Sequence, residues 1–330
     1  MLAIVVAELG GPEVLVLAEH PDPVRVLAEH PDPVPGPGQV VVEVAAAGVN
    51  FIDIYRRSGV YRQPVPYIPG HEGAGTVTAV GEGVTEFSAG DHVAWNDCPG
   101  SYAQLVAADT GRLVHVPAGI DLKVAGAVML QGLTAHYLCR STFPVTDGAV
   151  TVVHAAAGGV GLLLTQMIKD LGGTVIATTS SAPKAELAEQ AGADHVTSYE
   201  EFPQVVLQVT GGRGADVVFD GVGRDTFDAS LSVLRPRGMM VLYGGSSGQV
   251  PPVDPQRLNS GGSLYLTRPT LANYVADRDE LRWRASDVFG WIGQGQLSVR
   301  IGAEYPLAGA PLAQEDLAAR RTTGKLVLIP

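Results

Sequence analysis

The chain has 330 residues, of which 46% are hydrophobic and 17% charged, and this composition is typical of a globular protein with a buried core. The length favours two domains. The formal net charge of −12 argues against a nucleic-acid partner, and the absence of a run of about 18 apolar residues argues against a membrane span. Two cysteines, Cys98 and Cys139, are too few for a disulfide framework, so we expect a cytoplasmic protein.

The N-terminal third predicts short strands joined by turns. MLAIVVAELG is interpreted as a first strand and the β-branched run Val40–Val44 as another. The segment VLAEHPDPV occurs twice, at 16–24 and at 26–34. A tandem copy this short, in a proline-rich stretch, does not indicate a repeat architecture, so we interpret it as a local duplication that enlarges a surface loop.

From about residue 148 onward, apolar strands alternate regularly with helical segments. Strands are expected at AVTVVHA, TVIATT, DHVTSY, ADVVFDGVG, GMMVLYGG and SLYLT, with helices such as GGVGLLLTQMIKDLG between most of them. This alternation predicts an α/β fold, a doubly wound parallel sheet with helices on both faces. After Pro269 the pattern predicts a helix at 272–293, a strand at 298–304, a helix at 311–320 and a last strand, KLVLIP. That strand does not fit the alternation and could return to the first domain.

The turn HAAAGGVG, at 154–161, lies between a buried strand and a buried helix, where the phosphate-binding turn of a dinucleotide site is expected. Gly158 would let the backbone approach a pyrophosphate. Gly161 would let the helix pack closely on the strand. In this alternating context the turn predicts a bound dinucleotide.

The choice of dinucleotide depends on the end of the second strand. It reads TTSSAPK, with no acid before Glu186. A carboxylate at this place holds the ribose of NAD, whereas hydroxyl groups and a lysine attract a ribose phosphate. Ser180, Ser181 and Lys184 therefore favour NADPH over NADH.

His71 and Glu72 could be half of a zinc site. The surrounding segment, AAGVNFIDIYRRSGVYRQPVPYIPGHEGAGTVTAVGEG, resembles the medium-chain dehydrogenase/reductase superfamily, in which an early cysteine and this histidine bind catalytic zinc. Asn50 stands at the position of that cysteine, and Gln131 at that of the third ligand. Because amides are poor zinc ligands, we expect a protein without metal.

Several motifs follow one another along the chain: GVNFIDIYRRSGVY, LQGLTAHYLCR, HAAAGGVG, DGVGRD and TRPTLANY, with RRTTGKLVLIP at the end. Together they resemble the NADPH:quinone oxidoreductases, the zeta-crystallin-like branch of the zinc-independent medium-chain dehydrogenases/reductases. The resemblance implies a Rossmann dinucleotide-binding domain at 130–270 and a mainly β, GroES-like catalytic domain made of 1–129 and 271–330. It also implies a homodimer, with the nicotinamide in the cleft between the two domains.

The resemblance further implies which residues form the site. Asn50 and Tyr61, with Tyr55 in reserve, would hydrogen-bond the oxyanion that develops on the substrate. The cofactor would contact Phe51, Asp53, Tyr55, Thr134, Tyr137, Gly158, Gly159, Val160, Gly161, Ser180, Ser181, Lys184, Tyr199, Gly221, Tyr243, Gly244, Gly245, Ser246, Arg268, Pro269, Leu271 and Arg320.

Several of these residues have a purely structural alternative. Asp53 could be a helix N-cap, and Arg320 a cation at a helix C-terminus. Tyr55 could belong to the core, Tyr199 could pack on the sheet, and 244–246 could be an ordinary turn.

These inferences indicate NADPH-dependent reduction of a small-molecule quinone, by metal-free transfer of a hydride or of single electrons. Reduction of a quinone gives an anion stabilised by aromaticity, so no metal is needed to polarise the carbonyl. Three alternatives stay open: an enoyl or activated-alkene reductase, a zinc-dependent alcohol dehydrogenase, and a non-catalytic NADPH-binding protein like the crystallins.

Overall fold

The computed structural model of the chain describes residues 1–18 and 31–330. It contains two compact units, one made of Met1–Leu130 and Ala285–Pro330 and the other of Gln131–Arg284. The tandem copies of VLAEHPDPV lie largely outside the described residues, so their interpretation stays a prediction. No helix in the described part of the chain is long and apolar enough to cross a membrane.

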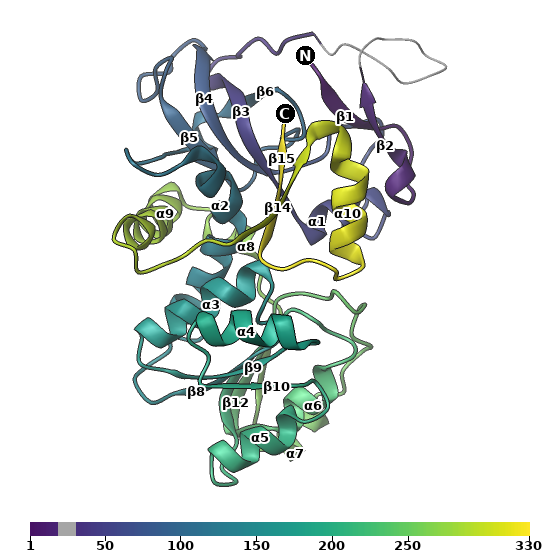
Figure 1. The fold of residues 1–330 in the computed structure, drawn as a ribbon, viewed down its shortest axis with the longest axis vertical. Coiled ribbons are helices and arrows are strands. Elements are labelled where there is room, and N and C mark those ends of the chain that lie inside the picture. Colours follow the sequence, from purple (N-terminus) through teal and green to yellow (C-terminus); the bar gives the residue numbers. More distant parts are fainter. Residues whose placement is uncertain (19–30) are drawn as a thin grey trace. The chain divides into compact units, whose positions relative to one another are not determined.

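The first unit is mainly β (Figure 1). Its main sheet has the strand order β14-β15-β3-β4-β5-β7, with β6 paired to β3, and β1 pairs with β2 separately. The KLVLIP strand, β15, pairs in parallel with β14 and antiparallel with β3, so the end of the chain joins this unit. The strands are β1 (Ala3–Val6), β2 (Leu15–Ala18), β3 (Gln39–Val49), β4 (Glu72–Val80), β5 (His92–Trp95), β6 (Leu105–Asp109), β7 (Val114–His115), β14 (Ile301–Pro306) and β15 (Lys325–Ile329).

Helices complete the first unit. The two in its C-terminal segment correspond to the helices predicted at 272–293 and 311–320, whereas no helix is predicted for the two that lie before residue 138. Helix α1 (Phe51–Arg57) begins after Asn50, and α10 (Ala310–Ala318) precedes the last strand. Helix α2 (Leu122–Tyr137) begins in this unit, and α9 (Arg278–Gly293) ends in it. The expected single helix at 272–293 is in fact two, α8 (Leu271–Tyr274) and α9, separated by residues 275–277.

The second unit contains the predicted doubly wound parallel sheet, with the strand order β10-β9-β8-β11-β12-β13. Helices α5 and α6 pack their apolar side chains on one face, and α3 and α4 cover the other (Figure 1). The strands are β8 (Val150–Val153), β9 (Thr174–Thr178), β10 (His195–Thr197), β11 (Ala215–Asp220), β12 (Leu234–Leu242) and β13 (Tyr265–Thr267). The helices are α3 (Gly159–Asp170), α4 (Ala182–Gln190), α5 (Phe202–Val209), α6 (Phe227–Ser232), α7 (Gln256–Ser260) and α8 (Leu271–Tyr274).

The boundary expected at 270/271 lies at 284/285 instead. The fully buried side chain of Arg284 bonds the segment after β13 to other parts of the second unit. Its guanidinium donates to the Tyr274 carbonyl at 2.9 Å and contacts His136 Nδ1 at 2.9 Å. It also donates to Ser141 Oγ, in the π-helical turn Leu138–Thr142 that follows α2.

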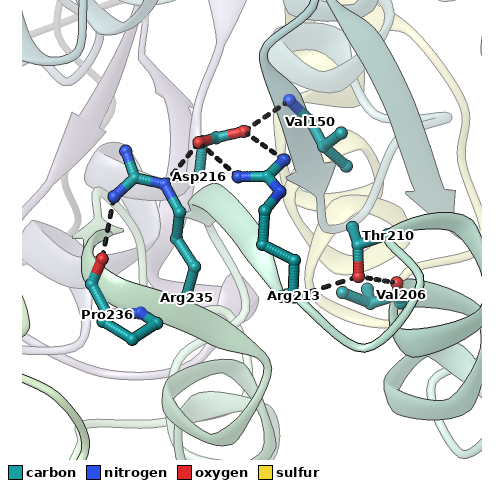
Figure 2. Close-up of polar contacts among 8 residues, drawn as sticks. Val150, Val206, Thr210, Arg213, Asp216, Arg235 and Pro236 are labelled. Atoms are coloured by element: carbon teal, nitrogen blue, oxygen red, sulfur yellow. Dashed lines mark hydrogen bonds and ion pairs between the residues drawn. The ribbon is translucent and has the colours of Figure 1, made fainter.

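Asp216 ties the amino ends of three parallel strands together (Figure 2). Its carboxylate accepts from both terminal nitrogens of Arg213 at 3.0 and 3.1 Å and from Arg235 Nε at 2.5 Å. It also accepts from the Val150 amide at 2.8 Å. Burial raises the pKa of Asp216, but these hydrogen bonds outweigh it and lower the pKa to about 2. The network stabilises the edge of the sheet opposite to the edge where ligands bind in such folds.

Candidate active site

The strand order in the second unit reverses between β8 and β11, because successive strands are added outward from β8 on one side and from β11 on the other. Open α/β sheets bind their ligands at the carboxyl ends of the strands beside such a reversal. The turns after β8, β9, β11 and β12 are therefore where a dinucleotide would bind, and about half of the expected contact residues lie in them or in the first turns of the helices that follow.

The turn after β8 has the close packing that its glycines predict. Gly158 caps α3, and its amide donates to the Ala155 carbonyl at 2.9 Å. A Cβ at position 161 would lie 2.5 Å from the Ala155 carbonyl oxygen and 2.6 Å from Ala156 Cα. Glycine is therefore required at 161 for α3 to start this close to the strand. Val160 is half-buried in the first turn of the helix.

Gly159 has a neighbour that the sequence does not reveal. A Cβ on this residue would overlap the carboxamide of Gln131. Gln131, which stands where the superfamily places a third zinc ligand, therefore lies over the first residue of α3. The missing side chain at 159 makes room for Gln131 as well as for an approaching ligand.

The turn after β9 brings a hydroxyl group and a cation together. Ser180 is exposed, and Lys184 Nζ lies 3.4 Å from Ser180 Oγ. Ser181 is the N-cap residue of α4, and its carbonyl accepts from the Lys184 amide. The structure thus places all three expected phosphate-binding residues in one turn.

Buried polar residues that the sequence did not reveal join three of these strand ends. His154, just after β8, contacts Thr178 Oγ1 at 2.8 Å and Ser230 Oγ at 2.9 Å. Ser230 also donates to Asp220 at 3.4 Å. Burial lowers the pKa of His154, so its ring is neutral at pH 7. Its ring centroid lies 5.9 Å from that of Tyr199, which places this predicted contact residue against the network.

The glycines after β11 and β12 allow two turns to cross closely. A Cβ on Gly244 would lie 2.5 Å from the Gly221 carbonyl oxygen, and the Ser246 amide donates to that same oxygen at 3.2 Å. Gly245 lies between them and is half-buried. Burial raises the pKa of Tyr243. The Asp220 carboxylate and the phenol groups of Tyr137 and Tyr199 raise it further. These two closely packed turns gather several of the expected contact residues.

The remaining expected contacts of the second unit lie near Tyr137. Its ring stacks on Tyr274 with centroids 4.2 Å apart, and Thr134 is buried one helical turn earlier. Burial raises the pKa of Tyr137, and the guanidinium of Arg268 acts in the opposite direction. Arg268 is exposed, Pro269 is buried and Leu271 is half-buried at the start of α8.

In the first unit, α1 and the segment after it carry a row of aromatic side chains. The centroids of Phe51 and Tyr55 are 6.1 Å apart, and those of Tyr55 and Tyr61 are 5.6 Å apart at an interplanar angle of 77°. Tyr55 is half-buried, and Tyr61 is 44% exposed. Arg320 lies elsewhere in this unit, just after α10, exposed and with φ of +57°.

Asn50 and Asp53 have structural functions at the start of α1. Asn50 is the N-cap, and Asp53 completes a capping box by accepting from the Asn50 amide at 2.9 Å. Asp53 is therefore not the N-cap that the sequence allowed but the third residue of the helix. Its carboxylate is buried and also accepts from Tyr102 Oη at 3.0 Å.

The Asn50 side chain lies in a buried polar cluster with Glu72 and Lys325. Lys325 Nζ donates to Asn50 Oδ1 at 2.7 Å and to Glu72 Oε2 at 2.5 Å. Asn50 Nδ2 donates to Glu72 Oε2 at 2.8 Å and to the Gly48 carbonyl at 3.3 Å. Both amide hydrogens of Asn50 are thus used within the unit.

The residues at the superfamily's zinc position do not fit a zinc ion. Zinc needs thiolate, imidazole or carboxylate ligands around an open position, whereas Asn50 offers an amide and Lys325 places an ammonium against Glu72. His71 Nδ1 lies 3.3 Å from Asp97 Oδ1. Among the described residues, no group of three His, Cys, Asp or Glu side chains could hold a metal ion.

Comparison with known proteins places similarity along the whole chain. Residues 36–160 match the family described as "Alcohol dehydrogenase GroES-like domain", and residues 159–277 match "Zinc-binding dehydrogenase". The chain is 45% identical to a quinone oxidoreductase of Pseudomonas aeruginosa, over 98% of each chain. It is 38% identical to a 2-haloacrylate reductase of a Burkholderia species, over 100% of this chain and 99% of that one. A solved structure of Escherichia coli quinone oxidoreductase complexed with NADPH is 39% identical, with 100% of both chains covered and a TM-score of 0.94.

Proposed function

The chain belongs to the quinone oxidoreductase branch of the medium-chain dehydrogenases/reductases, and we propose that it reduces quinones with NADPH. The observation that carries the proposal is the Ser180 hydroxyl beside the Lys184 ammonium at the carboxyl end of β9. A hydroxyl donor and a cation together suit the ribose phosphate that distinguishes NADPH from NADH. When bound, the nicotinamide supplies the hydride.

The turns of the second unit would hold the rest of the cofactor. The first amides of α3 have no partner within the helix and would bind the pyrophosphate oxygens, and the positive end of the helix dipole favours the negative charge there. Gly158 lets this backbone approach the ligand closely. The glycines at 221, 244 and 245 would let the next two turns approach the sugar in the same way. Tyr199, backed by His154, would lie against the adenosine end.

Tyr61 is the donor that we propose for the oxyanion forming on the quinone, with Tyr55 beside it. Asn50 positions α1 in this proposal and does not donate. Loss of an oxyanion donor often lowers the rate by about two to three powers of ten. Because the hydroquinone anion is intrinsically stable, we expect Tyr61→Phe to lower kcat by less than about tenfold. The exposed Tyr265 of β13 provides the control, Tyr265→Phe. Complete loss of turnover in Tyr61→Phe would mean that Tyr61 is a true acid.

The experiment that tests the proposal follows NADPH oxidation on addition of an ortho-quinone, with NADH and chelator-treated protein in parallel. We expect rapid turnover with NADPH that survives the chelator, because the chemistry needs no metal. Loss of activity with the chelator would restore the zinc-dependent alternative. Tight NADPH binding without turnover of any acceptor would indicate a non-catalytic role.

The cofactor preference is tested with Lys184→Ala. A charge-assisted hydrogen bond contributes about 1.5–3 kcal/mol, so the KM for NADPH should rise roughly ten- to hundredfold while the KM for NADH stays unchanged. Lys123→Ala is the control, because Lys123 is an exposed lysine paired with Glu304 in the first unit. Equal effects on both cofactors would show that Lys184 does not contact the phosphate.

An activated-alkene reductase is the second candidate, and the similarity to a 2-haloacrylate reductase supports it. The same hydride can be added to an α,β-unsaturated acid, so 2-chloroacrylate belongs in the assay as a competing acceptor. A higher kcat/KM for the alkene than for the quinone would make this the main activity. We further propose that the protein is a cytoplasmic homodimer, which its mass by light scattering would test.

A further inference from the structure

The buried cluster of Asn50, Glu72 and Lys325 follows from strand pairing in the first unit. Gly48 pairs with Glu72 at the start of β4, and Val49 pairs with Leu326 at the start of β15. The end of β3 therefore lies between the first residues of its two neighbours. The exposed fractions are 5% for Asn50, 0% for Glu72 and 1% for Lys325.

The surrounding backbone leaves space for this cluster. A Cβ at position 48 would overlap Glu72 Oε2 and would lie 2.8 Å from Lys325 Cε. The Leu130 amide donates to Glu72 Oε1 at 2.7 Å, so each carboxylate oxygen has a partner. Both carboxylate oxygens therefore have a donor, and Lys325 Nζ donates two hydrogen bonds within a closely fitted space.

Stability does not explain why the chain keeps this pair. Desolvation of two charges is costly, and replacement of a buried ion pair by apolar residues of similar size is often neutral or stabilising. What the pair does achieve is a single orientation of the Asn50 amide, because Lys325 can only donate and the Glu72 carboxylate can only accept. Asn50 in turn caps α1, the helix that carries Phe51 and Tyr55.

We propose that Lys325 is a positioning residue for quinone reduction, an inference that rests on the proposed function. Its ammonium fixes the Asn50 side chain and with it the start of α1. It also gives the buried Glu72 carboxylate a positive partner beside Asn50, which stands where the superfamily places a zinc-binding cysteine. A lysine thus replaces the metal as the cation of the cluster.

The test uses Lys325→Met and the double variant Glu72→Met/Lys325→Met. The single variant leaves a buried carboxylate without its cation and could fail to fold. The double variant removes both charges, keeps the apolar volume and still leaves Asn50 without its two partners. Lys123→Met, on the surface of the same unit, is the control. The measurements are the KM and kcat for the quinone, the Kd for NADPH, hydrogen exchange of the α1 amides and bound zinc.

In the folded double variant we expect the KM for the quinone to rise about tenfold, with faster exchange in α1 and a Kd for NADPH within about twofold of the unaltered protein. A purely structural role would reduce the folded fraction, and hence the apparent kcat, without a change in KM. An unchanged KM with unchanged exchange in α1 would therefore overturn the positioning role. Stoichiometric zinc in the unaltered protein would overturn the replacement of the metal.

The two proposals can fail separately. If the unaltered protein binds NADPH but reduces no quinone, the proposed function fails, and the positioning role in quinone reduction fails with it. Hydrogen exchange does not depend on turnover. Faster exchange in α1 of the double variant would then show that Lys325 holds the helix for some other purpose.

Discussion

Replacement of Asp216 by asparagine should destabilise the second unit and remove part of its pH dependence. Its hydrogen bonds to the two arginines and the Val150 amide hold the pKa of the Asp216 carboxyl group at about 2, against an ordinary value of 3.8. At roughly 1.4 kcal/mol per pH unit, this difference corresponds to about 2 kcal/mol of stability at neutral pH. Solvent around Arg213, whose side chain is 46% exposed, makes this an upper value. An asparagine cannot accept from both arginines and the Val150 amide at once, so one donor loses its partner.

The sign of the pH effect follows from the lowered pKa. The contribution of Asp216 is fully present above pH 4 and is lost as the pH falls toward 2, because protonation of the folded state then competes with the ion pairs. The difference in stability between the unaltered protein and Asp216→Asn should therefore be large at pH 7 and small near pH 2.5.

Urea unfolding by circular dichroism at pH 7, 4 and 2.5 measures this difference, and hydrogen exchange of the β8 and β11 amides assigns it to the second unit. Asp225→Asn is the control, because Asp225 pairs with Arg224 while both side chains are more than half exposed. That variant should change stability by less than about 0.5 kcal/mol. A difference for Asp216→Asn below that value at pH 7, or the same at all three pH values, would refute the reasoning.

Three further changes test the packing. Gly161→Ala should destabilise the protein by about 3 kcal/mol, because its Cβ would overlap the backbone. Gly290→Ala should stabilise it by about 0.5–1 kcal/mol, because Gly290 lies in α9 with open space around it. Thermal unfolding that ranked the two variants in the opposite order would contradict this. Arg284→Met should cost about 3 kcal/mol because it leaves buried partners unpaired, and a shift in Tm below about 2 °C would show otherwise. Burial raises the pKa of Cys98 and Cys139 to about 12, so a thiol reagent at pH 8 should label neither in the folded protein and both in urea, and rapid labelling without urea would contradict the buried state.

The parallel sheet and its glycine turn could be predicted because their signals are local. Each strand of the second unit is a short apolar run with a helical segment after it, and that order specifies a doubly wound sheet. Gly161 is required by atoms only five and six residues before it, so a motif of eight residues contains the whole reason for it. Helix α1 also has a local signal, the Asn50–Asp53 capping box, but seven residues are too few for a clear helical period.

The residues that the sequence did not reveal depend on contacts between distant segments. Lys325 bonds Glu72, 253 residues away, only because β15 and β4 lie on either side of β3. Arg284 bonds His136 from 148 residues away. A lysine at the start of a strand and an arginine in a helix are usually solvated, so neither pattern could show that these two side chains are buried.

Strand β11, six residues long, carries an aspartate near each end, and we expect the two to have different functions. Asp216, near its amino end, is surrounded by arginines, whereas Asp220, at its carboxyl end, accepts from the amides of Val222 and Gly223 in the turn where a dinucleotide would bind. Parallel strands place all their amino ends at one edge of the sheet, so a change at Asp216 is remote from the turns at the other edge. Asp216→Asn should therefore lower the free energy of unfolding and leave the KM for NADPH unchanged. Thr226→Val removes a 2.7 Å hydrogen bond to Asp220 and should raise that KM with a smaller loss of stability.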